Sequence, residues 1–276
     1  MIVKPKQIVI QGHRGARGLL PENTIESCIE AVKCGVHGLE IDVVVSKDGQ
    51  LVVSHEPWMS PLFCSFPNGK PVDTEGVFLY QMNYTDIQLF DCGQRGHPVF
   101  TTQKPIKTYK PTLHDLVTAV EDFCKNENKP IPFFNIEVKS HPTWYRKYVP
   151  APSTFVQILQ KETIILQNER YLSNFYISSF DPLFLKVLKN RMPRCTMAFL
   201  TENHLSLEMN LKRLGFKPQM YSPYYRFLTP KTLQNAHKMG VKIVTWTVND
   251  KHVAQKLIMM GVDGLITDYP NLNYLT

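Results

Sequence analysis

Several features that define simple protein classes are absent from this chain of 276 residues. No run of about eighteen apolar residues occurs, which excludes a membrane-spanning helix. The six cysteines lack the C-x-x-C spacing of metal-binding or thioredoxin-like motifs. The net charge is +7, but no block of about five or six like charges concentrates it. We therefore expect an ordinary solvated basic surface and not a nucleic-acid-binding tail.

The cysteines and the first residues predict a compartment. Cys28 and Cys34 lie in or beside the first predicted helix, where reduced cysteines fit as small buried side chains. A Cys64–Cys92 disulfide is the less favoured alternative. The segment MIVKPKQIVI is too short and too polar for a signal peptide. We expect a cytoplasmic protein, or a periplasmic or secreted one if a leader has been removed.

The chain does contain a repeating alternation of strand-like and helix-like segments. Helices should end at glycines, as at Gly35, Gly215, Gly240 and Gly261. Eight strands alternating with helices predict a single α/β domain over residues 1–276, a (β/α)8 TIM barrel, which commonly needs about 250 residues. The predicted strands are residues 8–10, 39–45, 132–139, 174–178, 195–199, 219–221, 241–245 and 264–266.

Three carboxylates predict a metal site at one end of this barrel. Glu40 and Asp42 are two residues apart on one strand, so both point to the same face, and Glu137 lies on the next strand. Buried carboxylates repel one another and are costly to leave unpaired. A site made only of oxygen ligands suits Mg²⁺ or Ca²⁺. The alternative is a structural salt bridge to Arg14 or Lys139.

Basic side chains fall beside these acids. His13 and Arg14 follow the first strand, His55 follows residues 51–53, and Lys139 ends the third strand. Imidazoles transfer protons near neutral pH. The two cations can stabilise negative charge on a bound anion. These residue types therefore suit metal-assisted acid–base chemistry on an anionic substrate.

The ordered motifs HRG, PENT, E-x-D, DG and V-x-H in residues 8–55 resemble the N-terminal signature of the glycerophosphodiester phosphodiesterases. The resemblance implies hydrolysis of glycerophosphodiesters to sn-glycerol 3-phosphate and an alcohol, with His13 and His55 as the acid and base in an order left open. It also implies that Glu22 lines the site and that Trp246 packs against the glycerol. The alternatives are that Glu22 only begins a helix and that Trp246 only packs in the barrel core. Loop structure explains Ser178, Asn249 and Asp268.

Residues 56–111 interrupt the alternation with seven prolines. They resemble the small insertion that this family carries after its second strand, at the rim of the active site. We expect one short ordered piece at residues 87–90, and the aromatic residues of the insertion should form a small core in preference to a lid.

Two other functions remain open. A phospholipase D-like enzyme on lysophospholipid or sphingolipid head groups needs an exposed apolar or disulfide-tied rim, and a non-catalytic polyanion-binding barrel would use the positive charge. We expect a small-molecule substrate and no nucleic acid or transmembrane segment. The alcohol, the choice of ion, the attacking group (water or a glycerol hydroxyl), any lid motion and the oligomeric state are not determined.

Overall fold

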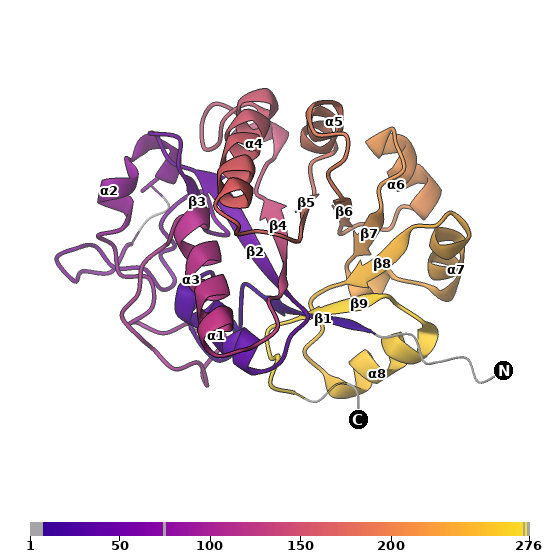
Figure 1. Cartoon of the computed structure of the whole chain (residues 1–276), viewed down its shortest axis with the longest axis horizontal. Helices are drawn as coiled ribbons and strands as arrows, with labels where there is room; N and C mark the ends of the chain where they lie inside the picture. The colour runs from indigo at the N-terminus through magenta and orange to yellow at the C-terminus, as the bar shows by residue number, and fades with distance from the viewer. Residues whose placement is uncertain (1–7, 74–75, 273, 275–276) are drawn as a thin grey trace.

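The computed structural model describes residues 8–73, 76–272 and 274 (Figure 1). Within these residues, eight parallel strands close a barrel in the order β1-β2-β4-β5-β6-β7-β8-β9, and β1 pairs with both β2 and β9. They span Val9–His13, Gly38–Val45, Phe133–Val138, Phe175–Ser179, Met197–Thr201, Met220–Pro223, Lys242–Thr245 and Gly264–Thr267. The short strand β3 (Leu51–Val53) pairs antiparallel with β2. The predicted TIM barrel is confirmed.

Helices lie outside the barrel between successive strands (Figure 1). They begin where side chains accept a hydrogen bond from a free backbone N–H, as Thr24 does from Ser27 and Asp250 does from Val253. Gly215 and Gly261 end α6 and α8 in the left-handed conformation, as predicted. The helices are α1 (Ile25–Lys33), α3 (Leu113–Asn126), α4 (Pro152–Asn168), α5 (Pro182–Arg191), α6 (Leu207–Leu214), α7 (Pro230–Lys238) and α8 (Lys251–Met260).

A network of polar side chains lies inside the barrel below the mouth. The side-chain carbonyl of Gln11 accepts hydrogen bonds from Asn135 (3.1 Å) and from the Tyr176 hydroxyl (3.0 Å). Ser178 donates to the Asn135 carbonyl at 2.7 Å. All four side chains are buried, and paired polar groups of this kind hold a core in one arrangement. Asn135 and Ser178 also line the cavity described below, so this network forms its floor.

The insertion has an apolar core of its own. Phe63, Ile87 and Phe90 are buried together with Val44 and other side chains, which confirms the expected small core. Its regular elements are a 3₁₀ turn, η1 (Leu79–Gln81), and the helix α2 (Tyr84–Ile87). The sequence predicted a short ordered element at residues 87–90. The helix α2 instead ends at Ile87, so that prediction is displaced by three residues.

One cysteine prediction is wrong. Cys64 and Cys92 form a disulfide within the insertion, whereas the sequence favoured reduced cysteines. The two cysteines are 28 positions apart in the sequence, and the segment between them has no periodicity that would show them to be adjacent. Such a bond typically stabilises a fold by about 2–4 kcal/mol. Disulfides persist mainly in oxidising compartments, and the compartment of this protein stays a prediction. The remaining four cysteines are free, and Cys28 is buried as expected.

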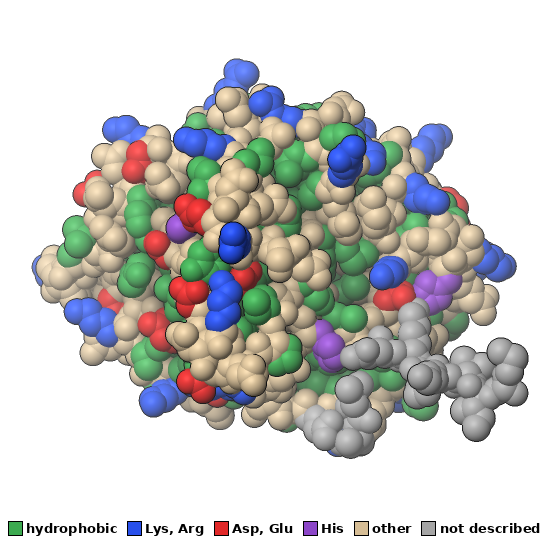
Figure 2. Space-filling view, viewed as in Figure 1, with side chains coloured by type: hydrophobic (Ala, Val, Ile, Leu, Met, Phe, Trp, Pro, Cys, Tyr) green, Lys and Arg blue, Asp and Glu red, His purple; other side chains and the backbone are tan. Residues whose placement is uncertain are grey.

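Positive charge is scattered over the face of the molecule that Figure 2 shows. On the face shown in Figure 2, Lys and Arg side chains are spread around the periphery with acidic residues between them. This distribution agrees with the expected solvated surface. No helix in the described part of the chain has the length and apolarity needed to cross a membrane. The signal-peptide expectation concerns residues 1–10, and residues 1–7 of that segment lie outside the described residues.

Candidate active site

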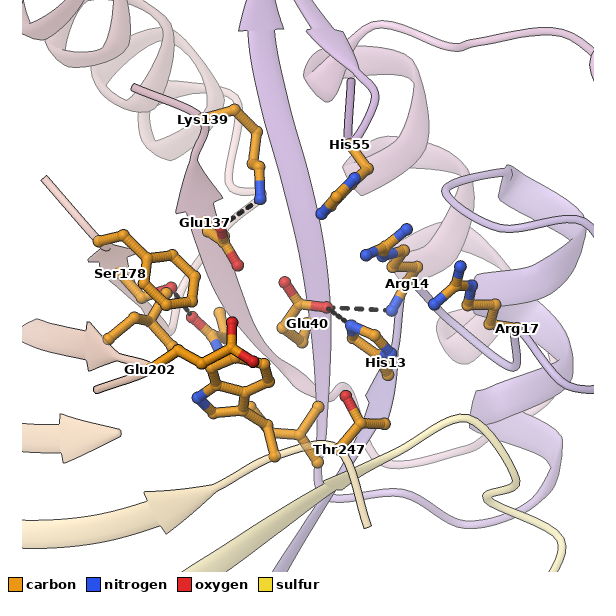
Figure 3. Close-up of a pocket in the computed structure, with 15 residues that line it drawn as sticks. His13, Arg14, Arg17, Glu40, His55, Glu137, Lys139, Ser178, Glu202 and Thr247 are labelled. Atoms are coloured by element: carbon orange, nitrogen blue, oxygen red, sulfur yellow. Dashed lines mark hydrogen bonds and ion pairs between the residues drawn. The ribbon is translucent and has the colours of Figure 1, made fainter. Parts of the chain in front are cut away.

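A cavity of about 310 Å³ opens at the end of the barrel where the strands finish (Figure 3). Seven of the nine predicted site residues line it, and they come from the ends of five separate chain segments. Asp42 and Glu22 are absent from this lining and lie behind it, where both are buried. The lining residues are His13, Arg14, Glu40, His55, Glu137, Lys139 and Trp246.

The three predicted carboxylates gather at this cavity. The sheet register places Asp42 directly beside Glu137, and Glu40 lies on the same face of β2 as Asp42. One oxygen from each of the three lies within 4.8 Å of the others. Burial raises the pKa of Glu40 well above its usual value, and the charges of Asp42 and Glu137 raise it further. One oxygen of Glu40, Oε1, is buried without a hydrogen-bond partner.

Two cations neutralise part of this cluster. Asp42 lies 3.3 Å from Arg14 Nε and 3.4 Å from Lys139 Nζ, and Asn23 donates to it at 2.9 Å. Burial alone would raise the pKa of Asp42, but Lys139 and other positive groups hold it far below its usual value. Lys139 also donates to Glu137 at 2.5 Å. The salt-bridge alternative thus accounts for Asp42 and Glu137 but not for the unpaired oxygen of Glu40.

These contacts test whether a divalent cation fits the cluster. A cation would supply the missing partner of Glu40 Oε1, and three carboxylates with no cysteine ligand form a donor set that suits Mg²⁺ or Ca²⁺. The residues present therefore fit such an ion, and Glu40, Asp42 and Glu137 would hold it.

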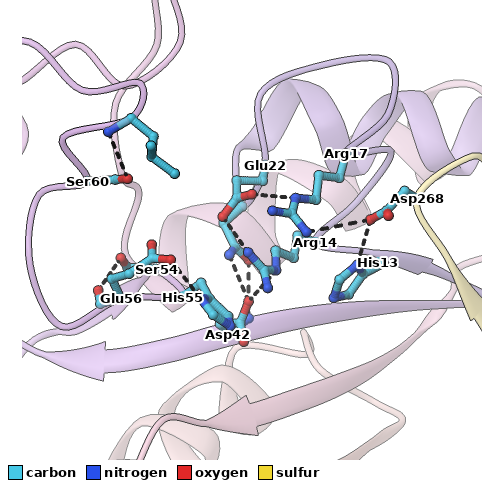
Figure 4. A network of polar contacts seen from close by, with 12 residues as sticks. His13, Arg14, Arg17, Glu22, Asp42, Ser54, His55, Glu56, Ser60 and Asp268 are labelled. Carbon is cyan, nitrogen blue, oxygen red and sulfur yellow. Dashed lines mark hydrogen bonds and ion pairs between the residues drawn. The ribbon is translucent and has the colours of Figure 1, made fainter. Parts of the chain in front are cut away.

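The loop after β1 is held by a buried ion-pair network (Figure 4). Arg14 has a left-handed backbone conformation (φ 51°), and its N–H donates to Glu40 at 3.1 Å. Its guanidinium donates to Glu22 at 2.7 Å, and Glu22 also lies 2.6 Å from Arg17 Nε. Burial would raise the pKa of Glu22, but Arg14 and Arg17 bring it well below the usual range. Glu22 therefore fixes two arginines that do line the cavity.

His13 has a partner that the sequence did not reveal. Its Nδ1 lies 2.6 Å from Asp268, the residue after β9, and Asn249 donates to the other oxygen of Asp268 at 2.7 Å. This leaves Nε2 of His13 toward Glu40, 3.9 Å away. Burial lowers the pKa of His13, and Asp268 opposes that effect. The predicted barrel did contain a signal for this contact. Closure of a barrel places its last strand beside the first, and Asp268 follows the last strand.

His55 has a similar arrangement. Its Nδ1 lies 2.8 Å from Glu56, the next residue in the chain. Ser54 donates to the backbone carbonyl of Glu56 at 2.7 Å, and the buried Lys110 donates to Ser54 at 2.9 Å. The insertion therefore supports the second histidine through Lys110. Glu56 lies beside a predicted residue in the sequence, but nothing in the spacing distinguishes it from a surface acid.

The family model described as "Glycerophosphoryl diester phosphodiesterase family" matches residues 13–272. The chain belongs to this family. It is 28% identical over 269 residues to the glycerophosphodiester phosphodiesterase of Caldanaerobacter subterraneus, covering 96% of this chain and 95% of that protein. This phosphodiesterase is accordingly a phosphoric diester hydrolase.

Solved structures of similar proteins agree with the fold. A putative glycerophosphoryl diester phosphodiesterase from Silicibacter pomeroyi superposes with a TM-score of 0.84 at 26% identity, covering 96% of this chain and 91% of that one. An Oleispira antarctica phosphodiesterase, solved in complex with the product sn-glycerol-3-phosphate, superposes with a TM-score of 0.74 at 21% identity and covers 95% and 94% of the two chains. The second likeness supports the barrel alone.

Trp246 lies at the mouth of the phosphodiesterase barrel and is only partly buried. Its indole N–H donates to the Ser222 carbonyl at 2.9 Å. The Phe180 ring packs against it at 5.4 Å with perpendicular planes, and the Tyr224 ring lies 5.3 Å away. The indole is therefore both packed and exposed to the cavity. Phe180 and Glu202, which also line the cavity, were not singled out by the sequence.

Proposed function

We propose that this protein hydrolyses glycerophosphodiesters to sn-glycerol 3-phosphate and an alcohol, using a divalent cation and two histidines. One observation supports this most strongly: two carboxylates, two imidazoles and two cations line one cavity of substrate size, and the carboxylate of Asp42 lies directly behind it within reach of the other two. A small molecule is the substrate. The Oleispira relative was solved with the product that this reaction would release.

The two imidazoles carry the proton transfers. His13, with its Nδ1 bound to Asp268, presents Nε2 to the cavity, and His55 is held by Glu56 in the same way. One takes the proton of the attacking hydroxyl, and the other gives a proton to the oxygen of the leaving alcohol. The attacking hydroxyl belongs to water or to the glycerol moiety. In either case one histidine accepts its proton.

Positive charge stabilises the phosphate as its bond breaks. Arg14 and Lys139 line the cavity and are each anchored by buried acids, so they stay in place when the substrate is absent. Burial tends to lower the pKa of Lys139, but Glu137 and Asp42 raise it overall, which keeps the ammonium charged. A bound Mg²⁺ or Ca²⁺ would supply further charge neutralisation at the phosphate oxygens.

We also propose that the chain works as one domain, with residues 56–111 as an insertion at the rim of this site. Arg17, which lines the cavity, lies over the Phe100 ring at 4.6 Å, and Gln103 donates to the Arg17 carbonyl at 2.7 Å. Lys110 supports the loop that carries His55. These contacts attach the insertion to the loop after β1 and to the loop after β3.

Metal removal should abolish activity. We expect release of sn-glycerol 3-phosphate from glycerophosphodiesters to stop after EDTA treatment and to return with Mg²⁺ or Ca²⁺, because the carboxylates would lose their shared ion. A coupled glycerol 3-phosphate assay over a panel of head groups measures this. Adding EDTA already saturated with Ca²⁺ controls for effects of the chelator. Full activity of the metal-free protein would contradict the proposed mechanism.

A specific observation favours a second candidate, a phospholipase D-like enzyme at a lipid surface. That role needs an exposed apolar or disulfide-tied rim, and the insertion has both. The side chains of Leu62, Leu89 and Val99 are 55%, 59% and 73% exposed, and the Cys64–Cys92 disulfide lies in the same lobe. Exposed apolar side chains of this kind occur on membrane-docking surfaces.

Vesicle binding separates the two candidates. The lipid-surface enzyme should sediment with phosphatidylcholine vesicles containing lysophosphatidylcholine, and the triple variant L62S/L89S/V99S should not. A matched variant of exposed apolar residues away from the insertion, M209S/M259S, controls for general loss of apolar surface. If the parent protein stays in the supernatant, the second candidate is excluded and the glycerophosphodiester activity stands.

A further inference from the structure

A second cavity, which we call the lower cavity, lies at the end of the barrel opposite the active site. It has a volume of about 290 Å³. Val9, Phe133 and Met220 line it, and these residues begin β1, β4 and β7, whereas the active-site cavity is lined from the ends of the strands. No step of the reaction proposed above uses the lower cavity.

Two glycines leave room for the lower cavity. The inward-facing layers of a β/α barrel are usually filled by bulky side chains. Gly38 and Gly264 begin β2 and β9 and have no side chain to place there. The Phe133 ring occupies the space beside Gly38, because a Cβ atom on that glycine would lie 2.3 Å from the ring. A Cβ atom on Gly264 would contact Val9 and Val244, which are both walls of the lower cavity.

One buried polar group faces the lower cavity without a partner. Gln11 is only 1% exposed and lines the lower cavity but not the one at the mouth. Its side-chain carbonyl accepts hydrogen bonds from Asn135 and Tyr176, whereas its amide NH₂ group donates none among the described residues. A buried donor without an acceptor is unfavourable. The lower cavity therefore favours a ligand that brings an oxygen acceptor to Gln11.

The inner wall around this amide is largely apolar and aromatic. The rings of Phe133 and Tyr176 lie 5.9 Å apart with their planes tilted by 34°, and Met220 is buried in the same apolar cluster. Walls of this kind pack well against a flat ring. The lining also includes one charged residue of each sign, Lys242 and Asp263, so it gives no preference for a charged ligand.

We propose that the lower cavity is a binding site for a small, uncharged aromatic carbonyl compound. The carbonyl oxygen accepts the hydrogen bond that the Gln11 amide offers, and the ring packs against Phe133 and Met220. A cavity of about 150 Å³ holds benzene, so this one suits a ligand of about ten non-hydrogen atoms. Gln11, Asn135 and Ser178 belong to the floor of the active-site cavity, so the ligand binds on the far side of that floor. This inference does not rest on the proposed function.

A matched pair of ligands tests the role of Gln11. Acetophenone has a carbonyl group where ethylbenzene has a CH₂ group. Gln11→Met keeps the length of the side chain and removes the donor, so it should weaken acetophenone binding about three- to tenfold, the usual contribution of one hydrogen bond. Ethylbenzene should bind the variant at least as tightly as it binds the parent protein. Ligand-observed NMR titration measures both affinities, and equal losses for the two ligands would overturn the assignment.

Blocking variants test the location. Thr196→Phe and Val9→Phe each place a ring at a partly exposed position in the lining of the lower cavity, and each should abolish saturable acetophenone binding. Val253→Phe, at a partly exposed valine of α8, is the matched control and should bind acetophenone as the parent protein does. Thermal unfolding shows which variants are folded, and one folded blocking variant is enough for the test.

Three results would overturn the inference. The first is a lack of saturable acetophenone binding by the parent protein, or unchanged binding in a folded blocking variant. The second is loss of binding in Trp246→Ala, which would place the ligand at the mouth of the barrel. The third is a crystal structure of the soaked protein with ordered water alone in the lower cavity. Acetophenone seen there with its oxygen on the Gln11 amide would support the inference directly.

Discussion

Glu40→Gln should reduce kcat/KM by about a thousandfold or more and prevent binding of the divalent cation. Glu40 contributes the carboxylate oxygen that has no other partner, so it depends most on the ion. Electrostatic stabilisation by a bound metal is worth several kcal/mol at the transition state, which corresponds to a loss of this size. Calorimetric titration with Mg²⁺ and Ca²⁺, together with the glycerol 3-phosphate assay, measures both effects.

The same variant separates a metal ligand from a structural residue. Removing one of three clustered negative charges relieves repulsion, so the metal-free variant should be at least as stable as the metal-free parent in thermal unfolding. Glu127→Gln, an exposed acid after α3, is the control and should keep metal and activity. If E40Q still binds the cation with parental affinity, Glu40 is not a ligand. If E40Q unfolds, the cluster is a structural salt-bridge face instead.

His13→Ala should lower kcat by about 10² to 10⁴ while the cation stays bound. This range is the usual contribution of one positioned acid or base. The carboxylates do not need the imidazole, since His13 Nε2 lies 3.9 Å from Glu40 and outside hydrogen-bond range. Steady-state kinetics measures the loss in kcat, and calorimetry measures the retained metal. His252→Ala, an exposed histidine of α8, controls for loss of any imidazole.

Asp268→Asn gives a graded form of the same experiment. The variant keeps the position of the His13 ring but removes the charge that stabilises its protonated form. We expect a smaller loss than in H13A, and we expect it in kcat and not in KM, because Asp268 does not reach the substrate side of the ring. An H13A enzyme with parental kcat would remove His13 from the mechanism. If D268N raises KM and leaves kcat unchanged, Asp268 acts in substrate binding.

Much of the site could be predicted because its chemistry is concentrated in local patterns. Glu40 and Asp42 stand two apart on a strand, and this alternation alone brings both to one face. Eight strand-like segments with helices between them indicate a barrel, and a barrel brings strand ends together at one mouth. The order of the strands is therefore enough to predict that the carboxylate of Glu137 lies near the other two, and the register of β2 with β4 puts it beside Asp42.

Other parts of the site could not be predicted, because they depend on contacts between distant segments. His13 and Asp268 are 255 residues apart, and Cys64 and Cys92 are joined inside a stretch without periodicity. The role of Glu22 as the partner of two arginines depends on the turn that Arg14 makes in its left-handed conformation. Side-chain direction in such a loop follows from packing and not from spacing.

By itself, the sequence determined the barrel, the acids and histidines of its mouth, and the type of ion that they suit. Periodicity, residue chemistry and the ordered motifs of residues 8–55 are local properties, so these features could be predicted from the sequence. Only the tertiary structure decided which side chains hold the histidines, which acid has an oxygen without a partner, and that Glu202 lines the cavity. Closure of the barrel and packing of the loops bring together residues that no sequence pattern connects.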